Sequence, residues 1–117
     1  MPKTAVTLMS FGFKYGGPPN ANYYFDVGFV KNPAREHGFW SDVDDKMTDF
    51  VLSQQEVRDF IGAVIPLVIL LSKVDQRQIF AFGCSAGRHR SAIIVKEIAK
   101  RLKDMEIEVD VQHRDLG

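Results

Sequence analysis

The chain has 117 residues, its 15 Lys and Arg side chains are balanced by 15 Asp and Glu side chains, and 45% of its residues are hydrophobic. This length suits one domain with a single core, and the charge balance excludes a global basic field that would attract nucleic acid or anionic lipid. One cysteine excludes an internal disulfide bond, and no signal-peptide pattern or apolar run of ~20 residues is present. We therefore expect a cytoplasmic protein with no membrane partner.

The first part of the chain predicts two strands and two loops. Residues 5–13 are apolar and rich in strand formers, and the Gly- and Pro-rich run 14–20 favours a loop after them. Residues 23–30 predict a second strand. The polar segment 31–45 predicts a long surface loop that carries Arg35 and His37, among others.

A long helix is predicted next. Ser53 and Glu56 have the spacing of a capping box, and apolar residues then recur at helical spacing as far as Ser72. Pro66 lies within this pattern and predicts a kink or a local break, because proline lacks the N–H that the preceding turn would bond.

The last third of the chain predicts a strand at 78–83, a loop, a helix from about Ser91 to Lys103, and a final strand with one exposed face at 107–111. A strand, a helix and a second strand in this order form a βαβ unit, whose strands run parallel. The sequence thus predicts an α/β fold, a single domain with a mixed or parallel sheet and flanking helices.

The loop between the first strand and the helix of this unit is the main candidate site. A Gly-containing loop that leads from a strand into a helix directs unpaired N–H groups and the positive helix end towards one point, which favours an anion. Arg88 and Arg90 add positive charge and His89 adds an imidazole, and guanidinium groups match phosphate oxygens. We expect a phosphate or sulfate ion here, held by amides from about Ser85 to His89 and by Arg90.

Two interpretations of this loop remain open. Cys84, five residues, Arg90 and then Ser91 fit the spacing of cysteine-dependent phosphatases, in which the thiolate attacks phosphorus and a carboxylic acid protonates the leaving group. Alternatively, the loop binds a phosphorylated ligand without turnover, and Cys84 is a small buried apolar residue. Gly83 gives the cysteine no polar neighbour, which favours binding. Four aspartates are candidate acids for the catalytic alternative: Asp42, Asp44, Asp45 and Asp115.

Four motifs in order give the chain a resemblance to the C-terminal domain of RapZ proteins. They are Ser10-Phe11-Gly12-Phe13-Lys14-Tyr15-Gly16, Phe25-Asp26-Val27 followed by Asn32-Pro33, Gly83-Cys84-Ser85-Ala86-Gly87-Arg88-His89-Arg90-Ser91, and His113-Arg114-Asp115-Leu116. The resemblance covers nearly all of residues 1–117. It implies a fold like a phosphofructokinase subdomain, a bacterial RNase adaptor, binding of small regulatory RNA and a pocket for glucosamine-6-phosphate.

The resemblance also implies roles for individual residues. Lys14 and Arg88 match the basic surface used for RNA, and Arg35, His37, His113 and Arg114 are candidates for further pocket or RNA contacts. Together with the loop chemistry, it gives the candidate ligand-binding set Cys84, Ser85, Gly87, Arg88, His89, Arg90 and Ser91.

Departures from the family pattern narrow these expectations. The chain contains no GxxxxGK[ST] motif, so we expect no ATP dependence. We also expect no metal site and no cofactor beyond an anionic ligand such as a phosphosugar. RNA-binding members continue into a Lys- and Arg-rich tail beyond the position of Gly117, so we expect weak, salt-dependent RNA binding here. A protein partner, a separate P-loop protein or a second copy of the chain remain open as partners.

Overall fold

The computed structural model describes residues 5–32, 44–74 and 78–115 of the chain. Its sheet has four strands: β1 (Ala5–Gly12), β2 (Tyr23–Asp26), β3 (Ile79–Cys84) and β4 (Glu108–His113). Their spatial order is β2-β3-β1-β4, and every neighbouring pair is parallel. The predicted α/β fold is therefore confirmed, with a sheet that is parallel throughout.

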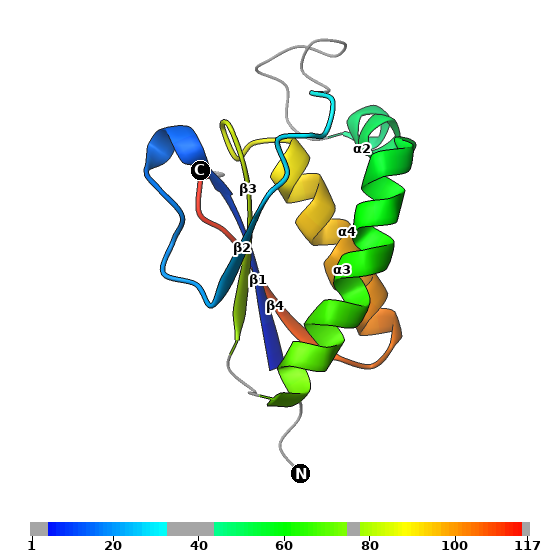
Figure 1. Cartoon of the computed structure of the whole chain (residues 1–117). Coiled ribbons are helices and arrows are strands. Elements are labelled where there is room, and N and C mark those ends of the chain that lie inside the picture. Colours follow the sequence, from blue (N-terminus) through cyan, green and yellow to red (C-terminus); the bar gives the residue numbers. More distant parts are fainter. Residues whose placement is uncertain (1–4, 33–43, 75–77, 116–117) are drawn as a thin grey trace.

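Three α-helices cover one face of this sheet: α2 (Asp45–Leu52), α3 (Gln55–Val74) and α4 (Arg90–Asp104) (Figure 1). A short 3-10 helix, η1 (Phe13–Tyr15), follows β1 on the other side. Within the described residues, no helix combines the length and the hydrophobicity that crossing a membrane requires.

The hydrophobic core lies between the sheet and the helices. Leu8 of β1 and Phe80 and Phe82 of β3 are fully buried there, against Ile94 and Ile98 of α4. Alternate residues of a strand point to opposite faces, so one face of each strand contributes to this core.

β2 is shorter than the strand predicted at 23–30. The Gly28 N–H donates to Oδ1 of Asp26 at 2.8 Å, and the Val30 N–H donates to the Val27 carbonyl at 3.2 Å. The Val27 N–H still donates to the Gly83 carbonyl of β3 at 2.8 Å, and the two local bonds replace strand pairing at Gly28 and Val30. Val27 and Val30 are buried in the core although they lie outside β2. Their apolar side chains therefore made the strand look longer in the sequence than it is.

The capping-box prediction at Ser53 is wrong, because this residue ends a helix that the sequence reading did not predict. α2 begins in the segment assigned to the surface loop, where the Asp44 carboxylate accepts the Met47 N–H at 2.8 Å as an N-cap. Ser53 is the C-cap of α2, and its hydroxyl donates to the Phe50 carbonyl. The bond from Ser53 to the preceding turn leaves its side chain unavailable to start α3.

α3 runs continuously through Pro66, so the predicted local break is absent. Pro66 is exposed, and the residue four positions earlier is Gly62, also exposed, with nothing within 4 Å of where its Cβ would be. Proline has no N–H to donate to the Gly62 carbonyl, and this carbonyl therefore faces water.

Candidate anion-binding site

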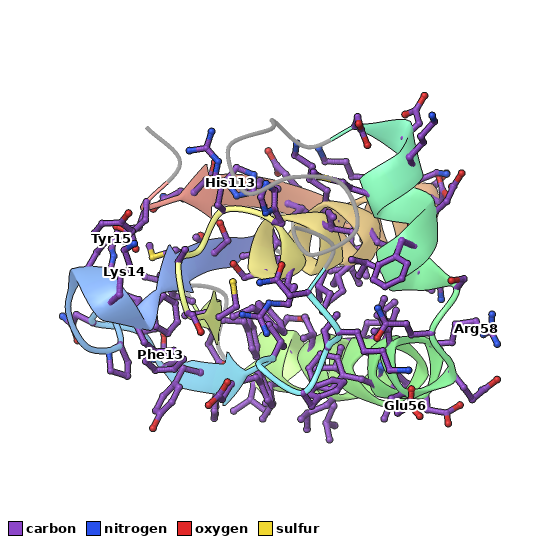
Figure 2. The ribbon with its side chains drawn as sticks, turned by 90° about the horizontal axis from the view of Figure 1, so that it is seen from above. Phe13, Lys14, Tyr15, Glu56, Arg58 and His113 are labelled. Carbon is purple, nitrogen blue, oxygen red and sulfur yellow. The ribbon has the colours of Figure 1, made fainter. Side chains whose placement is uncertain are left out.

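Because all four strands are parallel, the segments that follow them meet at one edge of the sheet. Figure 2 looks down on this edge, with Lys14 on η1 and His113 at the end of β4. A pocket of about 220 Å³ lies there, lined by Lys14, Asn32, Ser85, Ala86, Arg88, His89 and Arg90. Four of the lining side chains are basic and none is acidic, so the pocket suits an anion.

Backbone contact between β1 and the loop 85–89 gives the pocket its shape. The Lys14 N–H donates to the Ser85 carbonyl at 3.0 Å. Gly87 has φ +70°, and a Cβ there would lie 2.4 Å from the Gly12 nitrogen. A Cβ on Gly12 would lie 2.3 Å from the carbonyl carbon of Ala86. Two glycines therefore allow the end of β1 and the loop to touch.

Arg90 joins the loop to the segment that follows β2. It is the first residue of α4, and its guanidinium donates to the carbonyls of Gly28 at 3.1 Å and Val30 at 3.2 Å and to the Ser85 hydroxyl at 3.4 Å. These bonds hold the charge at the pocket wall, beside the N-terminus of α4, where the helix dipole also favours an anion.

Cys84 and Ser91 are buried residues that directly precede and follow the stretch of chain from Ser85 to Arg90. The Cys84 side chain is 3% exposed and belongs to the hydrophobic core, and its thiol donates a hydrogen bond to the buried Ser91 hydroxyl at 3.4 Å. Neither residue is among those that line the pocket, and Gly87 is not either. Their direct contact with a ligand stays a prediction.

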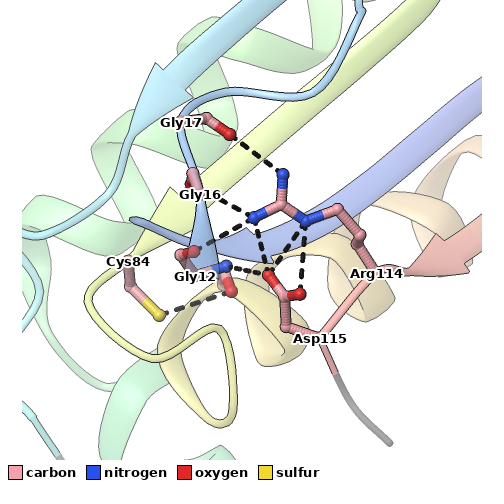
Figure 3. Close-up of polar contacts among 7 residues, drawn as sticks. Gly12, Gly16, Gly17, Cys84, Arg114 and Asp115 are labelled. Atoms are coloured by element: carbon pink, nitrogen blue, oxygen red, sulfur yellow. Dashed lines mark hydrogen bonds and ion pairs between the residues drawn. The ribbon is translucent and has the colours of Figure 1, made fainter. Parts of the chain in front are cut away.

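A pair of residues after β4 is bonded to the segment that carries Lys14. Asp115 accepts the Gly12 N–H at 2.7 Å and pairs with Arg114 at 2.9 Å (Figure 3). Burial raises the pKa of Asp115, but the hydrogen bonds from Arg114 and Gly12 and the Arg114 charge outweigh burial, so this pKa lies below its usual value. The carboxylate thus stays ionised, and this suits a structural partner better than a general acid.

The family model of the RapZ C-terminal domain matches residues 4–117, which is nearly the whole chain. The chain belongs to this family. Nucleotide-binding proteins of Clostridium acetobutylicum and Clostridium botulinum are 38% and 37% identical to it over 97% of its length, and each extends well beyond the match, which covers 41% of them. One from Salinispora tropica is 36% identical over 96% of the chain and 39% of the relative. The RapZ-type domain thus spans about two-fifths of these relatives.

Other predicted site residues of the RapZ-type domain lie away from the pocket or outside the described residues. Arg35, His37 and Asp42 fall outside them. Asp44 and Asp45 begin α2, where Asp44 serves as the N-cap. Within the described part of the chain, no group of three or more His, Cys, Asp or Glu side chains is placed to hold a metal ion.

Sequence reasoning did not select Asn32, which lines the pocket of the RapZ-type domain. The signal that could have identified Asn32 is the Asn32-Pro33 motif, which contributes to the family resemblance but was given no function of its own. Asn32 follows β2, and only the parallel sheet order brings this segment to the loop after β3.

His113 of the RapZ-type domain lies at a second, more open depression of about 450 Å³, which three lysines of α4 also line: Lys96, Lys100 and Lys103. Its Nδ1 is hydrogen-bonded to the Ser10 hydroxyl at 2.6 Å. Burial lowers the pKa of His113, and the Lys96 charge lowers it further.

This pKa predicts a pH-dependent stability. The folded state prefers neutral His113, whereas the unfolded chain binds a proton near pH 6.5, so the stabilisation is present above that pH and is lost as pH falls through the lower folded pKa. We expect the melting temperature to fall less between about pH 7 and about pH 5 for His113→Gln than for the wild type. Parallel melting curves would contradict this assignment.

Proposed function

We propose that this domain binds a phosphorylated small molecule of the phosphosugar class in the pocket at the carboxyl edge of the sheet. The observation that supports the proposal is the lining of that pocket by Lys14, Arg88, His89 and Arg90 beside the N-terminus of α4. Backbone amides, a helix end and guanidinium groups are the donors that proteins use for phosphate oxygens. Ser85 and Asn32 add neutral polar groups for the hydroxyls of a sugar.

The size of the pocket favours a phosphosugar over a nucleotide as its ligand. Its volume of about 220 Å³ is below the roughly 300–1,000 Å³ of pockets that enclose drug-sized ligands. The relatives' name, nucleotide-binding protein, describes proteins of which the matched part is 39–41%. For this domain we propose glucosamine-6-phosphate as the ligand to test first, and an adaptor role towards RNA or protein as its output.

The position of Cys84 favours binding over the phosphatase alternative. A nucleophilic thiolate must reach phosphorus, but the Cys84 thiol is 3% exposed, lies in the core and bonds Ser91. The Asp115 carboxylate, one of the candidate acids, is bonded to Gly12 and Arg114. Turnover at this site would need both groups to rearrange.

Calorimetric titration of the domain with glucosamine-6-phosphate, inorganic phosphate, glucosamine and ATP tests the proposal. We expect the two smaller phosphate compounds to bind, and glucosamine to show no binding because it lacks the phosphate. Lys14→Met is expected to weaken phosphosugar binding about fivefold, or ~1 kcal/mol, through loss of one partly solvated charge.

Lys73→Met is the matched control, because Lys73 is an exposed lysine at the end of α3 and does not line the pocket. Its affinity should equal that of the wild type. Glucosamine binding as tightly as its phosphate, or no binding of either, would refute the proposed function.

A further inference from the structure

We propose that Arg114 and Asp115 are positioning residues for the anion pocket: they hold the turn that carries Lys14, so that its charge faces the ligand. The inference rests on the proposed function, because it assigns these residues a part in the same site. Residues 10 and 113 are hydrogen-bonded although they are 103 positions apart, so the segment after β4 lies beside the end of β1.

Arg114 binds both ends of the turn. Its guanidinium donates to the carbonyl of Gly12 at 3.1 Å, on the N-terminal side of η1, and to those of Gly16 at 3.3 Å and Gly17 at 2.9 Å, on the C-terminal side (Figure 3). Asp115 holds the same turn through the Gly12 N–H at 2.7 Å. Three carbonyls and one amide around Lys14 are thus bonded to two consecutive residues.

The Lys14 backbone is also bonded to the loop 85–89, through its N–H and the Ser85 carbonyl. The Lys14 side chain is exposed and lines the pocket, and it lies 5.2 Å from the ring centroid of Tyr15. A flexible lysine that is held near its bound position loses less entropy when the ligand arrives, so the fixed turn raises the affinity.

Arg114 and Asp115 act on the pocket from outside it. Neither lines it, and the Arg114 donors are directed to Asp115 and to backbone carbonyls. The guanidinium also lies 5.2 Å from the ring centroid of the buried Phe11. A guanidinium fork is needed to reach several carbonyls at once, which a lysine in its place would not do.

A double-mutant cycle tests this role, with inorganic phosphate and glucosamine-6-phosphate as calorimetric probes. We expect Arg114→Met to weaken binding about fivefold when Lys14 is present, and to have no further effect in the Lys14→Met background. Arg101→Met is the control, since Arg101 is on α4 and pairs with Glu97. Equal losses in both Lys14 backgrounds, or no loss at all, would overturn the inference.

A second measurement does not depend on ligand binding. Hydrogen exchange at the Gly12 and Lys14 amides should be faster in Arg114→Met and in the milder Asp115→Asn, while α4 amides keep the protection of the wild type. If the wild type binds neither probe, the proposed function fails. Unchanged hydrogen exchange at both amides would refute the positioning role, whatever the binding result. If the wild type binds but Arg114→Met weakens binding equally with and without Lys14, the positioning role alone is refuted.

Discussion

Replacing Gly87 by alanine is expected to lower the free energy of unfolding by roughly 3 kcal/mol or more. Two causes add at this position. Its φ of +70° lies in the left-handed region that disfavours residues with a Cβ, and the added Cβ would lie 2.4 Å from the Gly12 nitrogen, a backbone atom that cannot move aside alone. Urea unfolding of both proteins measures the change.

Gly17→Ala provides the comparison for this prediction. Gly17 is an exposed loop residue with no atom within 4 Å of the position that a Cβ would take, and it lacks the positive φ found at Gly87. Its unfolding free energy should stay within about 0.5 kcal/mol of the wild type. Similar stabilities for the two variants would show that the loop 85–89 does not pack on the end of β1 as described.

Arg90→Ala is expected to weaken phosphosugar binding tenfold or more. A charge-assisted hydrogen bond contributes roughly 1.5–3 kcal/mol, and each ~1.4 kcal/mol is tenfold in affinity. The substitution also removes the bonds to the Gly28 and Val30 carbonyls, so the segment after β2 is released from the pocket wall. Calorimetry measures the affinity, and Arg101→Ala, on the exposed side of the same helix, should leave it unchanged.

Cys84→Ser distinguishes the binding role of the same loop from the catalytic alternative. Because the thiol is buried and outside the pocket lining, we expect Cys84→Ser to keep most of the wild-type affinity for the phosphosugar. Arg90→Ala, in contrast, should lose it. Neither the wild type nor the variant should release phosphate from an aryl phosphate or a sugar phosphate. Wild-type hydrolysis that disappears in Cys84→Ser would establish the phosphatase.

The strands and the loop were predictable because their signals are local. The apolar runs at β1 and β3, the alternation in β4 and the basic residues before α4 each lie within a few neighbouring positions. α2 was missed because its N-cap, Asp44, lies inside the polar segment 31–45, whose composition favours a loop. Ser53 was misassigned because one hydroxyl suits either helix end.

The contacts at the site that the sequence did not predict depend on sheet order. Asn32 reaches the pocket because β2 lies next to β3, and Arg114 reaches Gly12 because β4 lies next to β1. No spacing in the chain encodes these neighbours. The sequence makes Arg114 a candidate for pocket or RNA contacts, which stays a prediction, and the structure adds its bonds to three carbonyls of the turn that carries Lys14.

The pairing of β1 with β4 bears on how the domain can form during its synthesis. Residues that are bonded across these strands, such as Ser10 and His113, are 103 positions apart. At roughly 5–20 residues per second, the ribosome needs on the order of 5–20 s to make the intervening chain. Throughout that interval β1 has an unpaired edge, which invites association with other chains. The sheet is completed, and the turn that carries Lys14 gains its bonds to Arg114 and Asp115, only after β4 has left the exit tunnel.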